Sequence, residues 1–561
     1  MKRLLKNGMI VNVFTDTIER ANVLIEDERI AGIGNYTDGD ADIVEDISGK
    51  TVCPGFIDGH IHIESTMLQP SEFARIALPH GTTTLIADPH EIANVAGLDG
   101  MEYMLEASEG IPLDAYFMVP SCVPATGFDE SGAVLNAEDI KKYFFHPRVL
   151  GLGEMMNYPG VIYNDPSVIE KIEATKKAGM LINGHAPMLS GKDLDRYLAQ
   201  GIMDDHECSS LAEAKEKLGK GQTIMIRQGT AAKNLKELLP LFDEPYSRHC
   251  IIVSDDKDAA DLIYGHIDSI LREAVQSGKS PITGIRMASL QTARHFNLPY
   301  LGAVAPGYIA DLLVMDDLNS FLVSDVYKKG RKVVEKGKLI PFETPEVKEN
   351  IWKRVRTSMR GPVLNEKDFY IEPKGNCCQV IEIVPGQILT KSKVLFMNFS
   401  SGNGIDIKQD ILKVAVIERH HDTGHIGKGF ITGTGMKHGA IASSVSHDSH
   451  NIVVIGTNDK DMAAAANRIR ALGGGLVVVD DETVLAELAL PIGGLMSVDS
   501  AAEVSKQNVA VRATARILGT NEGIDPFMNM SFLSLAVIPS LKLTTKGLID
   551  VDQQKLVPLF L

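Results

Sequence analysis

Residues 54–65 read PGFIDGHIHIES, a short apolar stretch that carries two histidines, His60 and His62, separated by one residue. On a β-strand, residues i and i+2 point to the same face, so both imidazoles can reach a single metal ion. Taken alone, the pair is equally compatible with two histidines on a half-exposed strand face. The rest of the chain decides between these two interpretations.

Seven further β-rich runs follow this stretch, and helix-like segments separate them. The eight runs span residues 51–62, 82–90, 114–123, 149–156, 180–185, 202–206, 223–228 and 249–255. Alternating strands and helices are typical of βα units around a parallel sheet. Eight such units predict an α/β fold built on a (β/α)8 TIM-like barrel over residues 51–300, with the active site at the carboxyl ends of the strands.

Metal-ligand residue types occur at five of the eight predicted strand ends. They are His60, His62, Glu154, His185, His206 and Asp255. Each one alone is more typical of a satisfied polar side chain than of a ligand. Together they supply four imidazoles and two carboxylates, which is about what two divalent ions need, and a carboxylate can bridge the pair. The spacing therefore predicts a dinuclear metal site.

The segments outside the barrel predict two further domains. Residues 1–50 form short alternating runs, and residues 301–345 are again β-rich, so we expect the two to join in one composite β domain. Residues 361–561 predict an additional C-terminal α/β domain with a helix at Asp459–Leu472. The histidine-dense stretch 420–450 has no standard zinc spacing. We expect it to be a loop bundle through which this domain closes over the active site.

Composition limits the function classes. The chain has 561 residues and a net charge of −17, which disfavours a nucleic-acid partner. Six cysteines without a CxxC pair suit a reducing compartment. No run approaches ~18 apolar residues, and the N-terminus lacks a signal-like apolar region, so we expect a cytoplasmic protein that is not in a membrane.

The motifs as a set resemble the amidohydrolase superfamily, and within it the bacterial adenine deaminase family. They are PGFIDGHIHIES (54–65), GTTTLIADPHEIANV (81–95), GLGEMMN (151–157), NGHAP (183–187), DDHE (204–207), SDD (254–256), HHDTGHIGKGFITG (420–433) and SVSHDSHN (444–451). Many superfamily members bridge their metals with a carbamylated lysine where this chain has Glu154, but the adenine deaminase branch has glutamate there. The resemblance implies a urease-like composite β domain beside the barrel. It also implies a role in purine salvage, and two divalent ions, Mn²⁺ favoured and Fe²⁺ possible; we further expect a homo-oligomer, a dimer or higher.

On this resemblance, the expected reaction is hydrolytic deamination of adenine to hypoxanthine and ammonia. A metal-bridged hydroxide attacks C6, and Asp255 shuttles a proton to the leaving amine. We expect the proton for the ring to come from the cluster His90, Glu91 and Glu207, and purine contacts from Asp88, Ser121, Arg227 and Gln228. The alternatives are another amidohydrolase activity, on a 6-substituted purine or a cyclic amide, and a non-catalytic barrel scaffold. The scaffold is disfavoured because it would have lost metal ligands.

Overall fold

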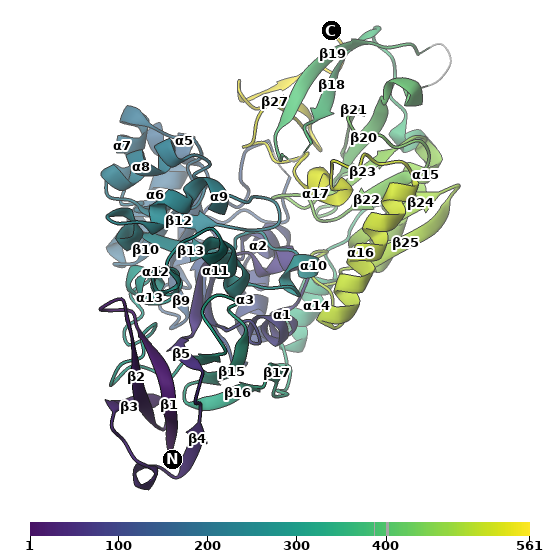
Figure 1. Ribbon diagram of the computed structural model, residues 1–561. Coiled ribbons are helices and arrows are strands. Elements are labelled where there is room, and N and C mark those ends of the chain that lie inside the picture. Colours follow the sequence, from purple (N-terminus) through teal and green to yellow (C-terminus); the bar gives the residue numbers. More distant parts are fainter. Residues whose placement is uncertain (129, 386, 400–402) are drawn as a thin grey trace.

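The computed structural model describes residues 1–128, 130–385, 387–399 and 403–561. It has three parts: a β-sheet domain at the N-terminal end, a barrel in the middle, and a β-rich domain with helices at the C-terminal end (Figure 1). The predicted α/β fold with a flanking β domain and a C-terminal α/β domain is confirmed. Among the described residues, no helix is both long enough and apolar enough to cross a lipid bilayer.

The barrel is made of eight parallel strands. They are β6 (Phe56–Ile61), β7 (Thr82–Ala87), β8 (Asp114–Val119), β9 (Val149–Met155), β10 (Leu181–Gly184), β11 (Asp204–Asp205), β12 (Thr223–Arg227) and β13 (Cys250–Val253). Strands β6 to β10 pair in sequence order, and so do β11 to β13. A parallel bridge between Ile61 and Asp255, with Asp255 N–H donating to the His60 carbonyl at 2.9 Å, joins the last strand to the first. The ends of β6 and β13 therefore meet.

Thirteen helices accompany the barrel strands in the described ranges. They are α1 (Pro70–Ala77), α2 (His90–Ala96), α3 (Leu98–Ala107), α4 (Ala137–Lys141), α5 (Tyr158–Ile162), α6 (Pro166–Lys177), α7 (Gly191–Ala199), α8 (Leu211–Gly219), α9 (Leu235–Leu238), α10 (Ala259–Leu262), α11 (Ile267–Gln276), α12 (Pro281–Met287) and α13 (Leu290–His295). Capping residues in the sequence mark where these helices begin. At α6, for example, Asp165 accepts the Ser167 N–H at 2.8 Å, and Pro166 occupies the first helical position.

The N-terminal sheet combines segments that lie about 300 residues apart in the chain. Its strands are β1 (Lys2–Asn12), β2 (Thr17–Glu26), β3 (Arg29–Gly34), β4 (Ile43–Asp46), β5 (Thr51–Pro54), β14 (Leu312–Met315), β15 (Val323–Lys328), β16 (Arg331–Glu335) and β17 (Lys338–Leu339). The predicted run 51–62 is thus two strands, because β5 pairs with β1 and β14 of this sheet and only β6 enters the barrel.

The C-terminal part holds an eight-stranded sheet and a small three-stranded sheet. The strands are β18 (Cys377–Ile383), β19 (Thr390–Phe396), β20 (Leu412–Ile417), β21 (Ile426–Thr432), β22 (Ala440–Ser443), β23 (Ile452–Gly456), β24 (Gly475–Asp480) and β25 (Thr483–Ala489), then β26 (Leu541–Thr544), β27 (Gly547–Asp550) and β28 (Lys555–Val557). The helices are α14 (Glu349–Arg356), which precedes the sheet, α15 (Asp459–Leu472), α16 (Ala501–Ile517) and α17 (Pro526–Ser531). Helix α15 has the predicted bounds, since the Asn458 side chain caps its first turn and Gly473 ends it at φ 78°.

This domain contacts the barrel at the carboxyl ends of the strands. Ser497 N–H donates to the Met67 carbonyl at 2.8 Å, and the Arg512 guanidinium on α16 donates to Asp258 at 2.6 Å. Both barrel residues lie just beyond the strand ends that carry the predicted ligands. The active-site end of the barrel therefore faces the C-terminal domain (Figure 1).

Candidate active site

The carboxylate of Glu154, at the end of β9, lies among five imidazoles. Its Oε2 is 2.8 Å from His206 Nε2, 2.9 Å from His185 Nδ1 and 3.8 Å from His60 Nε2. Its Oε1 is 3.6 Å from His62 Nε2 and 3.4 Å from His90 Nδ1. A carboxylate with both oxygens surrounded by nitrogen donors has the arrangement of a ligand that bridges two cations.

Asp255 adds a second carboxylate to the same centre. Its Oδ1 is 3.3 Å from His62 Nε2 and 3.6 Å from His60 Nε2, and its Oδ2 accepts from Arg227 Nη1 at 2.8 Å. The residue lies two positions past the end of β13 and has a φ of 58°, in the left-handed region. This unfavourable conformation is maintained by the bridge to β6 and directs the carboxylate at the two histidines.

The residues fit a pair of divalent ions. Two groups, His60–Glu154–His206 and His60–His62–Asp255, each have ligand atoms within 4.8 Å of one another. His62 Nδ1 lies 2.8 Å from the Asp88 carbonyl, an acceptor that places the proton on Nδ1 and leaves the Nε2 lone pair directed at the centre. His60 Nε2 is buried and has no hydrogen-bond partner among the described side chains and backbone. Buried nitrogen lone pairs beside carboxylates are the donor set of a transition-metal site.

His90 is also brought into this centre. We predicted it as a proton donor, but its ligand atom lies within 4.8 Å of those of His62 and Glu154. His185, His206 and Glu207 form another such group, with His185 Nδ1 3.6 Å from Glu207 Oε1. Both His90 and Glu207 therefore could contribute to ion binding as well as to proton transfer.

The electrostatics of the centre favour ionised carboxylates. Burial opposes ionisation of Glu154, but His185 and His206 outweigh it and hold its pKa well below the ordinary value. Burial likewise opposes ionisation of Asp255, and Arg227 with His60 and His62 holds its pKa well below the usual range. Burial lowers the pKa of His206, but Glu154 raises it to about 9. The cluster thus presents anions in a largely buried setting to whatever cation it holds.

Asp58, which sequence reasoning passed over, aligns two of the ligand-bearing strands. Its Oδ1 accepts the His60 N–H at 3.3 Å and the Ser254 N–H at 3.1 Å, and its Oδ2 lies 2.9 Å from His266 Nε2. All these groups are buried. The signal was present in the sequence, since Asp58 belongs to the motif that contains both strand histidines, but its partners Ser254 and His266 lie about 200 residues away.

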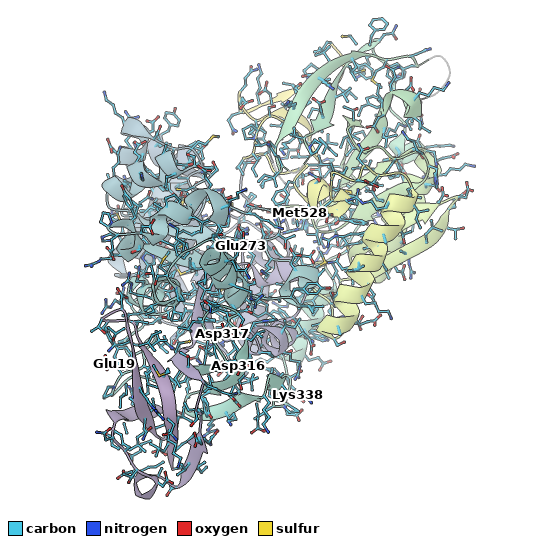
Figure 2. The ribbon with its side chains drawn as sticks, viewed as in Figure 1. Glu19, Glu273, Asp316, Asp317, Lys338 and Met528 are labelled. Carbon is cyan, nitrogen blue, oxygen red and sulfur yellow. The ribbon has the colours of Figure 1, made fainter. Side chains whose placement is uncertain are left out.

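Three of the four predicted purine contacts lie beside the centre, and the fourth, Gln228, does not. Asp88 Oδ2 accepts the Glu154 N–H at 2.7 Å, and Ser121 Oγ donates to the Glu154 carbonyl, so both brace the end of β9. Arg227 donates to both oxygens of Glu207 as well as to Asp255. Gln228 lies elsewhere: its side chain donates to Glu273 on α11 at 3.1 Å and accepts the Leu235 N–H. Glu273 is labelled in Figure 2.

Asp256 directly follows the predicted ligand Asp255, and regular strand alternation would turn its side chain away from the site. The strand ends at Val253, so alternation no longer applies at these positions. Asp256 instead accepts a hydrogen bond from Ser65 Oγ at 2.5 Å, and burial together with the neighbouring Asp255 raises its pKa. It belongs to the surroundings of the site.

Glu91, which follows β7, contacts the C-terminal domain rather than the central carboxylates. Its Oε1 lies 2.6 Å from His447 Nδ1, and its Oε2 pairs with His450 Nε2. Other histidines of the histidine-dense stretch contact barrel loops, as His421 Nε2 does with the Ser131 carbonyl at 2.9 Å. The two ends of the stretch 420–450 therefore lie against the barrel mouth. The expected loop bundle is wrong for its middle, which forms β21 and β22 of the C-terminal sheet and whose exposed His438 pairs with Asp480 of the same domain.

Comparison with known proteins agrees with this geometry. Residues 51–333 match the amidohydrolase family, and residues 387–555 match the adenine deaminase C-terminal domain. An adenine deaminase of Kosmotoga olearia is 47% identical over 100% of this chain and 96% of its own length. The chain belongs to the adenine deaminase family. Another member, from Oceanobacillus iheyensis, is 46% identical over 98% of this chain and 94% of its own length.

Among solved structures, a β-aspartyl dipeptidase of Fervidobacterium islandicum superimposes with a TM-score of 0.48 at 18% identity, covering 61% of this chain and 100% of that one. Membership of the adenine deaminase family makes this chain an amidohydrolase-family enzyme. The family implies divalent metal ions, and the clusters around Glu154 are where the structure offers ligands for them.

Proposed function

We propose that this enzyme deaminates adenine hydrolytically, giving hypoxanthine and ammonia. The observation that carries the proposal is full-length similarity to adenine deaminases combined with Glu154 at the centre of a histidine and carboxylate cluster. The chemistry balances with water alone. The water oxygen bonds to C6, the C6–N6 bond breaks, one proton completes ammonia and the other goes to the ring nitrogen N1.

We further propose that two divalent ions occupy the cluster. Their ligands would come from His60, His62, Glu154, His185, His206 and Asp255. Mn²⁺ is our preferred ion and Fe²⁺ the second choice, because mixed imidazole and carboxylate sites suit both metals. Bound ions of this kind lower the pKa of water, from 15.7 to about 7 in a favourable case, and so supply a nucleophile at neutral pH.

Asp255 is proposed as the proton shuttle. Its Oδ1 lies toward His60 and His62, where the attacking water would be activated, and Arg227 holds its Oδ2 at 2.8 Å. A carboxylate fixed in this way can take a proton from water and deliver it to the departing amine.

The ring nitrogen N1 needs a proton from another group. His90, Glu91 and Glu207 remain the proposed cluster for this role, without preference for one member. Glu91 contacts two imidazoles, and Glu207 accepts from both branches of the Arg227 guanidinium, so each carboxylate is held in a fixed position beside the centre. A group fixed in this way can transfer a proton to a bound ring.

The decisive experiment measures ammonia release from adenine, adenosine and cytosine by enzyme reconstituted with Mn²⁺. We expect release from adenine only. Ammonia release from adenosine at a comparable rate would contradict the proposed specificity, and no release from adenine would refute the function. A 6-substituted purine in the same assay tests the alternative amidohydrolase activity.

A further inference from the structure

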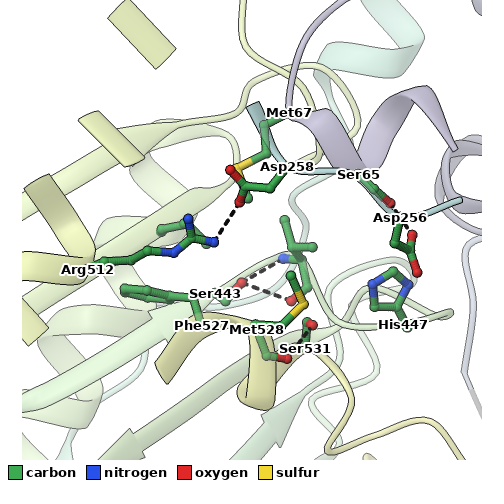
Figure 3. A pocket seen from close by; sticks show the side chains of 12 residues that line it. Ser65, Met67, Asp256, Asp258, Ser443, His447, Arg512, Phe527, Met528 and Ser531 are labelled. Atoms are coloured by element: carbon green, nitrogen blue, oxygen red, sulfur yellow. Dashed lines mark hydrogen bonds and ion pairs between the residues drawn. The ribbon is translucent and has the colours of Figure 1, made fainter. Parts of the chain in front are cut away.

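A cavity lies between the barrel mouth and the C-terminal domain (Figure 3). The barrel contributes Ser65 and Asp256 to its lining, and the C-terminal domain contributes His447 and Met528. Both barrel residues are close to predicted ligands in the chain, since Ser65 is three positions after His62 and Asp256 is next to Asp255. This cavity is therefore next to the candidate metal centre and has one wall from each domain.

His447 is held in a single orientation in this wall. Its backbone N–H donates to the Ser531 carbonyl at 2.8 Å, and its ring stacks on Phe532 with centroids 4.5 Å apart and planes inclined by 13°. Its Nδ1 is 2.6 Å from Glu91 Oε1. Across the described part of the chain no hydrogen bond engages its Nε2. The His447 ring thus has one hydrogen-bonded nitrogen, Nδ1, and one nitrogen without a described partner, Nε2, beside the cavity.

Glu91, His447 and His450 have the composition of a third metal site, but hydrogen bonding argues against one. The Ser446 N–H donates to His450 Nδ1 at 3.1 Å, so Nδ1 carries the lone pair and Nε2 carries the proton. His450 Nε2 must then donate to Glu91 and cannot offer a lone pair to an ion. Glu91 is an acceptor for two imidazoles, and its role is to orient His447.

The same side chains connect His447 with the central carboxylate. Glu91 Oε1 is 3.4 Å from His90 Nε2, and His90 Nδ1 is 3.4 Å from Glu154 Oε1. Only two side chains therefore separate His447 from Glu154. A purine with C6 at the metal centre would extend beyond it, and the cavity wall carrying His447 is one neighbouring surface that offers a polar atom with no partner among the described residues.

We propose that His447 is a purine-recognition residue supplied by the C-terminal domain, with its Nε2 hydrogen-bonded to a ring nitrogen of adenine. Glu91 and His450 act as positioning residues for it. The inference rests on adenine deamination as the function, and it adds a specificity contact from outside the barrel. Nε2 of His447 can serve with or without a proton. With a proton it donates to an acceptor nitrogen of adenine, and without one it accepts from the N–H of the adenine ring.

Two substitutions separate the two ring nitrogens of His447. His447→Asn keeps an amide nitrogen near the Nδ1 position, where it can still donate to Glu91, but has nothing at Nε2. His447→Gln places an amide near the Nε2 position. We expect His447→Asn to raise the Kd and KM for adenine at least ~10-fold, the effect of losing one good hydrogen bond, with two metal ions retained. His447→Gln should recover part of the lost affinity for adenine.

His425→Gln, at an exposed histidine that pairs with Glu130 away from the cavity, is the matched control.

Binding of 1-deaza-, 3-deaza- and 7-deazaadenine and of 9-methyladenine identifies the contacted nitrogen. In the wild type, one analogue should bind at least ~10-fold more weakly than adenine, and this difference should disappear in His447→Asn. Equal relative affinities in the two proteins, or an unchanged adenine Kd in His447→Asn, would refute the inference while leaving deamination intact. Failure of the wild type to release ammonia from adenine would instead refute the function itself, and the inference with it.

Discussion

Lys217 lies on α8, outside the proposed chemistry, and its replacement should destabilise the barrel and disturb the metal centre. Its side chain is fully buried, and its ammonium donates to Asp205 Oδ2 at 2.8 Å, Glu213 Oε1 at 2.7 Å and the Ala186 carbonyl at 2.7 Å. Asp205, also fully buried, precedes the ligand His206 and accepts the Ala186 N–H next to the ligand His185. One lysine thus supports two ligand-bearing strand ends.

Lys217→Met keeps the length of the side chain but leaves Asp205 buried without its cation. Removing one partner of a buried ion pair costs ~3–5 kcal/mol, because the remaining charge has lost both water and counter-ion. In this barrel that corresponds to a decrease in Tm of about 10 °C. Asp205→Asn in the Lys217→Met background removes the unpaired charge and should restore part of the stability.

The effect should depend on pH with a definite sign. Burial opposes ionisation of Asp205, but Lys217 outweighs it and holds the pKa below the ordinary value. In the wild type, Asp205 therefore adds stability above pH ~4, which is lost as the pH falls through its folded-state pKa. Without Lys217, burial alone raises that pKa. The Tm of Lys217→Met should thus lie furthest below that of the wild type at pH 7.5, and the difference between the two proteins should become smaller as the pH falls toward ~4.

Differential scanning calorimetry at pH 7.5 and 4.5, with elemental analysis of bound metal, measures both consequences. Lys220→Met is the control, because Lys220 is a neighbouring lysine in an exposed pair with Asp195, and its Tm should stay near that of the wild type. A Lys217→Met enzyme with wild-type Tm and full metal content would refute the reasoning. A decrease in Tm that is the same at pH 7.5 and pH 4.5 would also refute it.

Three other outcomes are expected. Asp255→Asn should lower kcat at least ~100-fold while part of the metal stays bound, and near-normal turnover at full occupancy would exclude the shuttle. Glu154→Gln should lower metal content, measured by elemental analysis, because a neutral amide cannot offer two anionic oxygens to two cations; Asp193→Asn, at an exposed pair with Arg196, is its control. Chelation should abolish ammonia release and Mn²⁺ should restore it, whereas full activity with a single bound ion would contradict the dinuclear site.

The sequence by itself determined the elements and the residue types of the site. Apolar runs and turn residues placed the eight barrel strands, and Asn458 with Gly473 defined the bounds of α15, because capping and φ preferences are local properties. The strand-end positions of His60 and Glu154 followed from the same local pattern, since barrel geometry brings the carboxyl ends of all strands to one rim.

Only the tertiary structure decided what those residues contact. The run 51–62 divides between two sheets because its first part finds hydrogen-bond partners in β1 and β14, far away in the chain. Asp256 turns toward the site because the backbone at Asp255 leaves the strand conformation to bridge β6. Glu91 meets His447, 356 residues later, because a second domain lies against the barrel mouth. Such contacts depend on how distant segments pack, and the local pattern of residues carries no record of that packing.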